Sequence, residues 1–191
     1  MQKSITRTQR ARREDIVSAA IVVINREGYA AASVERIAKE AETSKSTILY
    51  HFKTKEAIYE ELVITLYQNG ASYMTERIMA VETCRDKLRA YLSSNLHFIA
   101  EHAAHVNAVH WIQENGGLKS DGSDAVTPLT TLLSSGQKAG EFGSFDPVVM
   151  ALVIRAVVDG ASFHFTTHPN LDFEHYINQA IQLFEKATAL S

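Results

Sequence analysis

Residues 33–55, SVERIAKEAETSKSTILYHFKTK, constrain the fold more than any other stretch of the chain, because they predict two short helices separated by a tight turn. The first helix is predicted to begin at Ser33, whose hydroxyl can accept a hydrogen bond from a main-chain amide of the first turn. Its apolar residues recur at helical spacing and give it one buried side; they are Val34, Ile37, Ala38 and Ala41. Two helices joined in this way outline a helix-turn-helix.

The second helix of the pair is predicted to follow Ser44 and to run over residues 45–52. Ile48 and Phe52 share one face and are expected to pack inward. The opposite face is rich in hydrogen-bond donors and carries one tyrosine; its side chains are Lys45, Ser46, Thr47, Tyr50 and His51. Such side chains suit phosphate oxygens and the base edges of a DNA major groove. The alternative is a helical hairpin whose outer face is simply solvated.

Positive charge is concentrated in the same part of the chain. Residues 1–55 carry 11 Lys and Arg against 6 Asp and Glu, a balance of +5, whereas residues 56–191 carry 8 against 16, a balance of −8. Thr54 is predicted to cap a third, longer helix, whose first turn brings Lys53 and Lys55 near the same polar surface. A basic segment attracts DNA independently of sequence, and an acidic remainder discourages DNA from lying elsewhere.

The run GYAAASVERIAKEAETSKSTILYHFKTKEAIYEEL resembles the DNA-binding segment of the TetR family of bacterial transcriptional regulators. The resemblance implies an all-α fold, with an N-terminal three-helix helix-turn-helix DNA-binding domain over residues 1–53. A helical effector-binding and dimerisation domain is then expected over residues 54–191. It further implies a homodimer that binds a palindromic DNA operator as a ligand-responsive repressor.

Two departures from the family pattern alter the expected DNA contacts. The turn usually reads Ala-Gly-Val-Ser, whereas residues 41–44 here are Ala, Glu, Thr and Ser, so the glycine and the buried valine are missing. The usual phosphate-contacting tyrosine aligns with Leu49; we expect Tyr50 to take over a phosphate contact and Leu49 to be free for apolar contact, such as a thymine methyl group. The predicted DNA-binding residues are Ser33, Ser44, Lys45, Ser46, Thr47, Leu49, Tyr50, His51 and Lys55.

The chain opens with a basic segment, MQKSITRTQRARRED, followed by the apolar run IVSAAIVVI. A signal peptide is disfavoured, because Glu14 and Asp15 lie at the junction and the apolar residues have the period of an amphipathic helix. This helix is predicted to end near Gly28. The basic arm before it is expected to follow the DNA backbone or enter a minor groove, or else to be a solvated, disordered tail.

The remainder of the chain is predicted to be helical as well, because it contains long apolar-periodic stretches and the whole chain holds only three prolines and nine glycines. Gly70 is expected to bend or break the helix that follows Thr54. The single cysteine, Cys84, permits no intrachain disulfide, which fits a reducing cytoplasm.

Two C-terminal helices are strongly apolar. Asp146 and Pro147 form a helix start signal, and the helix after them is apolar nearly all round. Arg155 and Asp159 interrupt it, so a membrane span is disfavoured. Together with the last helix, from about residue 172 to residue 189, it is expected to form a four-helix contact in a homodimer. The alternative is a purely intrachain core.

The family resemblance also implies a small-molecule effector, bound among the helices between the DNA-binding segment and the dimer helices. The predicted ligand-binding residues are Tyr67, Met74, Tyr91, Asn95, Phe98, His110, Trp111 and Phe163. Because these residues include no anionic or cationic cluster, we expect a neutral effector that is partly lipophilic or aromatic. Side chains of these types at helical spacing are also ordinary core residues.

Motifs for catalysis do not occur: the chain has no G-x-G-x-x-G, G-x-x-x-x-G-K-[ST], G-x-S-x-G, C-x-x-C or H-E-x-x-H. We therefore expect neither an enzyme nor a cofactor. One alternative is a helical metal-binding protein or enzyme, since His97, Glu101 and His105 share a face if their helix is continuous, and His164 and His168 repeat that spacing. Such sets are also ordinary surface pairs, so we expect no metal. Another alternative is an adaptor that does not bind DNA.

Overall fold

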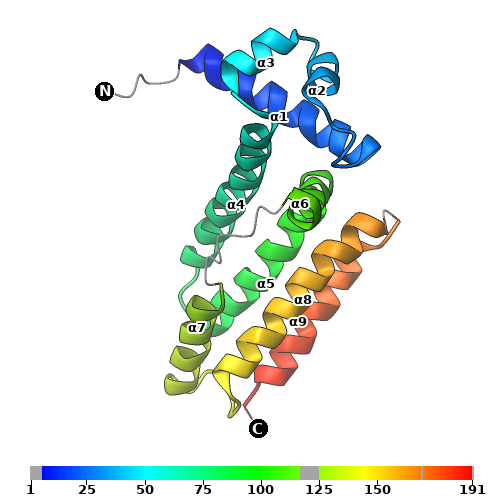
Figure 1. The fold of residues 1–191 in the computed structure, drawn as a ribbon. Coiled ribbons are helices and arrows are strands. Elements are labelled where there is room, and N and C mark those ends of the chain that lie inside the picture. Colours follow the sequence, from blue (N-terminus) through cyan, green and yellow to red (C-terminus); the bar gives the residue numbers. More distant parts are fainter. Residues whose placement is uncertain (1–5, 117–124, 169, 191) are drawn as a thin grey trace. The chain divides into compact units, whose positions relative to one another are not determined.

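The protein is described by a computed structural model over residues 6–116, 125–168 and 170–190 (Figure 1). Every regular element in these ranges is an α-helix, as the sequence predicts. The first six helices are α1 (Arg7–Glu27), α2 (Val34–Glu40), α3 (Lys45–His51), α4 (Lys55–Met79), α5 (Cys84–Glu101) and α6 (Ala103–Gly116). The remaining three are α7 (Val126–Lys138), α8 (Pro147–Thr167) and α9 (Phe173–Thr188).

The described residues form two compact units. The N-terminal unit comprises those within Met1–Tyr67 and Ala104–Ser120, and so contains α1, α2, α3, the first part of α4 and nearly all of α6. The C-terminal unit comprises those within Gln68–Ala103 and Asp121–Ser191, and so contains the rest of α4 with α5, α7, α8 and α9. The sequence suggests a boundary between residues 53 and 54, which would separate a DNA-binding part from an effector-binding part. This boundary does not coincide with the division into compact units, and it stays a prediction.

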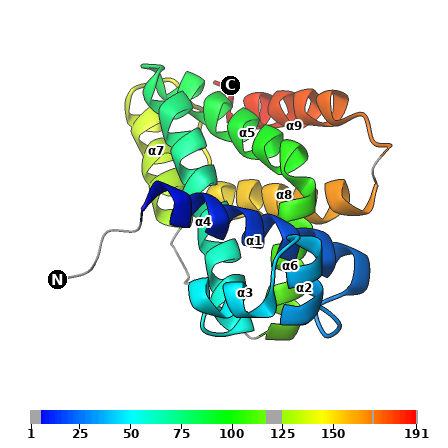
Figure 2. The same cartoon turned by 90° about the horizontal axis from the view of Figure 1, so that it is seen from above.

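The N-terminal unit is built on α1, which packs against both α2 and α3 (Figure 2). A capping box between Thr6 and Gln9 starts α1, and Gly28 ends it with a φ of +80°, a left-handed conformation that glycine adopts without a Cβ clash. The predicted end of this helix is thus confirmed. Its inward face is fully apolar, with Ile16, Ala20, Val23 and Ile24 at 0% exposure.

Helix α6 belongs to the same unit because polar contacts tie it to α1 and α4. The Asn25 side-chain amide donates to the Ala104 carbonyl oxygen at 2.8 Å, and its own oxygen accepts from Asn107 at 2.8 Å. On the other side, the His105 Nε2 lies 2.8 Å from the Leu62 carbonyl oxygen. Sequence periodicity gave no indication that a helix so far along the chain would pack with the first one.

Helix α4 passes through Gly70 without interruption, so the break that the sequence suggested there does not occur. A Cβ at this position would lie 3.1 Å from Cε1 of Phe98 on α5, closer than ordinary van der Waals contact. Gly70 is buried, and its missing side chain lets the Phe98 ring approach the α4 backbone. The glycine therefore allows close packing of α5 against α4.

In the C-terminal unit α5 is central and contacts α7, α8 and α9. Its buried stripe of Leu88, Leu92 and Leu96 forms one hydrophobic core with Ile154 of α8 and Phe184 of α9, among others. Burying a leucine or phenylalanine side chain stabilises a fold by roughly 1.5–3 kcal/mol. This core is therefore sufficient to hold the four helices together.

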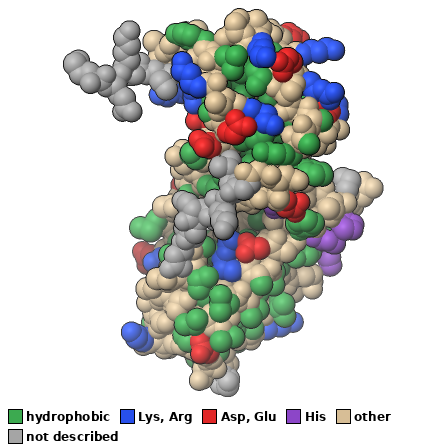
Figure 3. All heavy atoms as spheres, in the orientation of Figure 1, with side chains coloured by type: hydrophobic (Ala, Val, Ile, Leu, Met, Phe, Trp, Pro, Cys, Tyr) green, Lys and Arg blue, Asp and Glu red, His purple; other side chains and the backbone are tan. Residues whose placement is uncertain are grey.

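Helix α8 begins as predicted. The Asp146 carboxylate accepts hydrogen bonds from the amides of Val148 at 2.8 Å and Val149 at 3.1 Å, and Pro147 occupies the first turn. Its outward face, however, remains apolar and open to solvent, and hydrophobic side chains gather over α8 on the face seen in Figure 3. The large exposed ones are Val148, Val149, Leu152, Val153 and Phe163, each 48–56% exposed.

By length and composition alone, α8 is also the one helix in the described ranges that could cross a membrane, with a mean hydropathy of 1.7. A single helix of this kind is weak grounds for a membrane protein, because apolar core and interface helices pass the same test. Arg155 and Asp159 form an ion pair within it.

Candidate nucleic-acid interface

The two short helices α2 and α3 begin where the sequence predicts. The Ser33 hydroxyl accepts from the amide of Arg36 at 3.3 Å, and the Ser44 hydroxyl accepts from the amide of Thr47 at 3.0 Å. Ser44 Oγ also lies 2.8 Å from the hydroxyls of Ser46 and Thr47. The first turn of α3 therefore presents three hydroxyl groups linked by hydrogen bonds.

The inward face of α3 is confirmed, with Ile48 at 0% and Phe52 at 2% exposure. A contact that the sequence did not predict holds the other end of this helix. Arg13 of α1 donates through Nη1 to the main-chain oxygen of His51 at 2.6 Å and through Nη2 to Glu61 of α4 at 3.0 Å. Its guanidinium carbon lies 3.9 Å from the centre of the Phe52 ring. Arg13 thus fixes the C-terminal end of α3 against α1 and α4.

The outward face of α3 carries the polar set that the sequence places there. Lys45, Ser46, Leu49 and Tyr50 are exposed, Tyr50 at 67%, whereas Thr47 is partly buried. The Tyr50 ring meets the His51 ring edge-on at 5.1 Å between centroids, and its hydroxyl accepts from Gln9 of α1 at 3.5 Å. The Tyr50 hydroxyl therefore stands beside the start of α1.

The ammonium of Lys45 forms an ion pair with the carboxylate of Glu35 on α2. The hydrogen bond from Lys45 is the main reason that the pKa of Glu35 is lowered from its usual value. Both side chains are more than half exposed, at 55% and 59%. A carboxylate thus competes with any phosphate for Lys45, which the sequence spacing of ten residues did not indicate.

The turn between α2 and α3 contains no glycine, yet its backbone adopts a conformation that usually requires glycine. Glu42, at the position where the resemblance leads us to expect glycine, has a φ of +47°, and it is the one non-glycine residue in the described chain with a positive φ. The amide of Thr43 donates to the Ala38 carbonyl oxygen at 2.9 Å, which closes the turn. A side chain in this left-handed region is strained, so the turn keeps its shape at some cost in stability.

Thr54 caps α4 as predicted, since its hydroxyl accepts from the amide of Ala57 at 3.1 Å. Lys55 is partly buried and its ammonium lies 4.9 Å from the Tyr29 ring centre and 5.3 Å from that of Tyr59. The ammonium predicted to face DNA therefore lies against two aromatic rings.

The basic segment at the start of the chain is helical from Arg7, so the expectation of a free arm or a disordered tail over residues 7–13 is wrong. Arg7, Arg10 and Arg12 are exposed, while Arg13 is turned inward. Lys3 lies outside the described residues. On the face seen in Figure 3, Lys and Arg side chains spread over the N-terminal unit, with a few acidic side chains among them.

The predicted effector residues fall into both compact units. Tyr67, His110 and Trp111 are in the N-terminal unit. There, the Tyr67 hydroxyl accepts from Gln113 at 3.0 Å, and Trp111 is 40% exposed. Burial lowers the pKa of His110, and the nearby Glu114 partly offsets this.

The other five predicted effector residues, Met74, Tyr91, Asn95, Phe98 and Phe163, are in the C-terminal unit. Asn95 and Phe98 are each 7% exposed, while Phe163 is 56% exposed. The Asn95 amide donates to the Tyr91 carbonyl oxygen at 2.8 Å, and the Tyr91 hydroxyl accepts from Arg155 at 3.1 Å. The Arg155 guanidinium, which is not among the predicted effector residues, therefore lies beside Tyr91. The assignment of these residues to an effector site stays a prediction.

The histidine arrangement required for the metal-binding alternative does not occur. Helix α5 ends at Glu101 and α6 begins at Ala103, so His97 and His105 are not on one continuous helix. His97 instead pairs through Nε2 with Glu174 at 3.2 Å. Within the described ranges, no group of three or more His, Cys, Asp or Glu side chains is placed to hold a metal ion.

The segment that contains α2 and α3 matches a known protein family. Residues 16–62 fit the family model described as "Bacterial regulatory proteins, tetR family", a span that runs from α1 into α4 and encloses α2 and α3. The fatty acid metabolism regulator protein of Bacillus subtilis (strain 168) is 32% identical over 89 residues, which are 44% of this chain and 44% of that protein. The chain thus spans less than half the length of the curated relatives it matches.

Solved structures share the fold over nearly the whole chain. A tetR-family regulatory protein from Rhodococcus RHA1 aligns with a TM-score of 0.80 at 20% identity, over 94% of this chain and 98% of that one. AibR, in complex with isovaleryl coenzyme A and operator DNA, aligns with a TM-score of 0.75 at 19% identity, over 90% of this chain and 97% of AibR. The segment match over residues 16–62 agrees with the resemblance seen in the sequence, and the solved structures show that the chain shares their all-helical fold.

Proposed function

We propose that this protein is a cytoplasmic, homodimeric transcriptional regulator that binds a palindromic DNA operator and acts as a ligand-responsive repressor. The observation that carries the proposal is the construction of α3. It is a short helix with a buried apolar face, a hydroxyl-rich first turn, and Lys45 and Tyr50 exposed on its outer face. Serine, threonine and lysine side chains beside a helix N-terminus are suited to phosphate oxygens, and the same helix fits a major groove.

In this proposal residues 1–53 bind DNA and residues 54–191 bind the effector and form the dimer. Serine hydroxyls at the starts of α2 and α3 contact phosphates, Lys45 and Tyr50 contact phosphates, and Leu49 contacts a thymine methyl group. Lys55 has to leave the rings of Tyr29 and Tyr59 if it is to reach DNA. It is therefore the member of the predicted DNA-binding set that contributes least.

A homodimer is supported by the exposed apolar face of α8. Leu152 and Val153 are 52% and 48% exposed in the middle of this face, and Leu183 of α9 is 59% exposed. Contiguous exposed apolar side chains of this kind mark interaction surfaces. Pairing α8 and α9 with the same helices of a second copy removes them from water and relates two α3 helices by a twofold axis. Two reading helices about 34–36 Å apart then fit successive major grooves on one side of the duplex.

The effector is proposed to act through linkage. A ligand that binds more tightly to a conformation with wrongly spaced reading helices must weaken DNA binding by the same factor, typically about 5- to 150-fold. A partly lipophilic effector is supported by the apolar and aromatic character of Met74 and Phe98, which both lie in the C-terminal unit. The isovaleryl coenzyme A bound by AibR is an example of a ligand with an apolar group in a protein of this fold.

The proposal is tested by selecting duplexes that the purified protein retains from a random pool and by measuring their affinity at several salt concentrations. We expect a palindrome, and an affinity that falls steeply as salt rises. Lys45→Ala combined with Tyr50→Ala should abolish specific binding, whereas Lys138→Ala, at the exposed C-terminal end of α7, should leave it unchanged. Binding that survives the double substitution would show that α3 is not the reading helix. Failure to retain any duplex would favour the adaptor alternative.

The dimer is tested separately by sedimentation of the free protein. Leu152→Asp places a charge in the proposed interface and should shift the protein toward the monomer, because an unpaired charge is costly to bury. Asn69→Asp adds the same charge at an exposed position on α4 and should leave the dimer intact. A monomeric wild-type protein would contradict the proposed symmetry even if DNA binding were found.

A further inference from the structure

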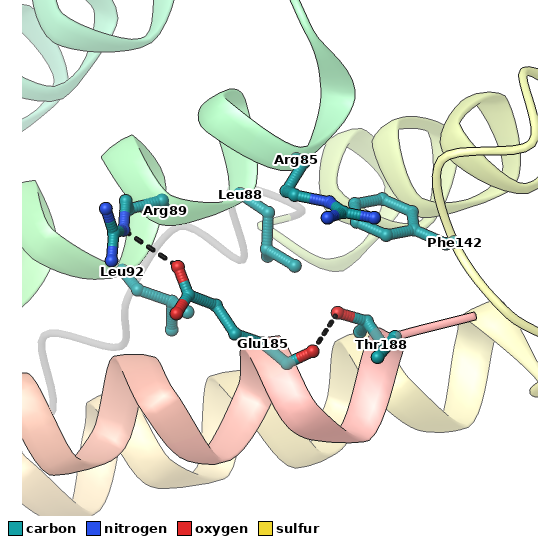
Figure 4. A pocket seen from close by; sticks show the side chains of 8 residues that line it. Arg85, Leu88, Arg89, Leu92, Phe142, Glu185 and Thr188 are labelled. Carbon is teal, nitrogen blue, oxygen red and sulfur yellow. Dashed lines mark hydrogen bonds and ion pairs between the residues drawn. The ribbon is translucent and has the colours of Figure 1, made fainter. Parts of the chain in front are cut away.

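A cavity of about 220 Å³ opens in the C-terminal unit between the first turns of α5 and the last turn of α9 (Figure 4). Phe142, in the connection between α7 and α8, forms part of its wall. None of the eight effector residues that the sequence predicts lines this cavity. It is therefore a separate place in the fold, and its chemistry has to be worked out from its own side chains.

One part of the lining is apolar and rigid. Leu88, Leu92 and Phe142 line the cavity and are 3%, 0% and 4% exposed, since most of each side chain is packed in the core. Gly136 of α7 packs so closely against Phe142 that a Cβ there would lie 2.2 Å from the ring. The ring position is thus fixed, and a compact apolar group placed against these side chains would leave water.

The other part of the lining is cationic. Arg85 and Arg89 lie one helical turn apart on α5 and both line the cavity, with Glu185 of α9 opposite them. Arg89 Nε pairs with Glu185 Oε1 at 2.8 Å. Two guanidinium groups at this spacing repel each other unless anions balance them. Glu185 balances one of the two.

The second guanidinium is met by an uncharged oxygen. Arg85 donates through Nη2 to the main-chain oxygen of Glu141 at 2.8 Å. The Glu141 carboxylate is turned to the start of α5, where Oε2 accepts from the main-chain amide of Arg85 at 2.9 Å. Among the described residues, the Arg89 guanidinium forms an ion pair, with Glu185, whereas the Arg85 guanidinium forms none. The lining as a whole carries one positive charge in excess.

We propose that this cavity binds a small monocarboxylate that carries a compact apolar or aromatic group. The carboxylate pairs with the Arg85 guanidinium, whose planar fork of donors matches two carboxylate oxygens. The apolar group lies on the accessible parts of Leu88 and Phe142, with Leu92 buried behind them. The Thr188 hydroxyl already donates to the Phe184 carbonyl oxygen at 2.8 Å, so it offers the ligand an acceptor and no charge. A neutral molecule of the same shape gains the apolar contact but not the ion pair.

Benzoate and benzamide test this proposal, because they share a shape and differ in charge. Each is titrated into the full-length protein without DNA, with calorimetry for affinity and main-chain amide NMR shifts for location. We expect saturable benzoate binding that shifts the amides of residues 85–92 and 185–189, and at least tenfold weaker binding of benzamide. Equal affinity for both compounds, no saturable benzoate binding, or shifts confined to other residues would each overturn the proposal.

Variants on α5 sharpen the result. Arg85→Gln should weaken benzoate binding at least tenfold and leave benzamide unchanged, while Arg85→Lys keeps the charge without the fork and should be intermediate. Lys87→Gln makes the same change of net charge on α5, at a residue that does not line the cavity, and should bind benzoate like the wild type. Wild-type affinity in Arg85→Gln would overturn the proposal. Since no DNA is present, this outcome is independent of whether the protein is a regulator.

Discussion

Arg13 provides the sharpest test of how α3 is held in place. Replacing it with methionine keeps most of the apolar stem and removes the guanidinium. Three contacts are lost together: the hydrogen bond to the His51 carbonyl oxygen at 2.6 Å, the pair with Glu61 at 3.0 Å and the contact with the Phe52 ring at 3.9 Å. All three join α1 to the end of α3 or the start of α4.

The expected loss of unfolding free energy depends on how exposed these three contacts are to solvent. The Arg13 side chain is 23% exposed and that of Glu61 38%, so solvent weakens their ion pair to at most about 1 kcal/mol. The charged hydrogen bond to a carbonyl oxygen contributes about 1.5 kcal/mol and the ring contact about 0.5 kcal/mol. Because the three contacts share one group, their sum is an upper limit, and we expect the N-terminal unit to lose about 2 kcal/mol of unfolding free energy.

Urea denaturation followed by tryptophan fluorescence measures this loss, since the only tryptophan of the chain, Trp111, lies in the same unit. Arg12→Met is the matched control: Arg12 is 43% exposed and makes one 3.6 Å pair with Asp15, so a loss below about 0.5 kcal/mol is expected. Arg13→Lys should recover less than half of the lost stability, because one ammonium cannot serve both acceptors. The reasoning is refuted if Arg13→Met is no more destabilising than Arg12→Met.

Three further predictions concern the same unit. Glu42→Gly should raise its stability by about 0.5–1 kcal/mol in the same urea experiment, because glycine adopts the φ of +47° without strain, whereas Ala41→Gly should lower it. Tyr59 is 1% exposed and donates to the Ala32 carbonyl oxygen at 3.0 Å, and its burial raises the pKa of its hydroxyl far above 10. The unfolding free energy should therefore be unaffected by this group below pH 10 and should fall above pH 10 by up to about 1.4 kcal/mol per pH unit. Tyr59→Phe should remove that part of the alkaline slope, and an unchanged slope would contradict it. Glu35→Gln frees Lys45 and should raise operator affinity severalfold at low salt, with a smaller gain in a Lys45→Ala background.

Helix starts were predictable because each depends on a few adjacent residues. Ser33, Ser44, Thr54 and Asp146 all cap the helices that the sequence assigns to them. A capping hydroxyl or carboxylate acts on amides two or three residues away, so the signal is complete within one turn. The same holds for the left-handed glycine at position 28, which ends α1.

Contacts between distant residues were not predictable in this way. The Arg13 and His51 contact spans 38 residues, and nothing in the basic run at the start of the chain distinguishes Arg13 from its neighbours. Helical periodicity can separate an inward from an outward arginine only once the length of the helix is known. The basic residues before the apolar run look like an arm in the sequence, whereas the capping box of Thr6 and Gln9 extends the helix to include those from Arg7 onward.

Gly70 and Glu42 show why a residue type alone misleads. Glycine inside a helix can mark either a break in the helix or the close approach of a neighbouring group. At Gly70 the close neighbour is the ring of Phe98. At Glu42 the glycine signal is missing, yet the backbone takes the conformation that glycine favours. At Gly70 the packing partner, which only the folded chain reveals, decides the role of the glycine.

The turn at Glu42 keeps its shape because the helices on either side leave it little choice. Ile37 and Ile48 are both fully buried, and the caps at Ser33 and Ser44 set where each helix begins. Burying two such side chains gains roughly 1.5–3 kcal/mol each, which exceeds the roughly 1–2 kcal/mol cost of one left-handed residue. A helix-turn-helix can therefore tolerate the loss of its turn glycine as long as its buried pair remains. It follows that Ile48→Ala should damage the surface formed by α3 far more than any substitution in the turn.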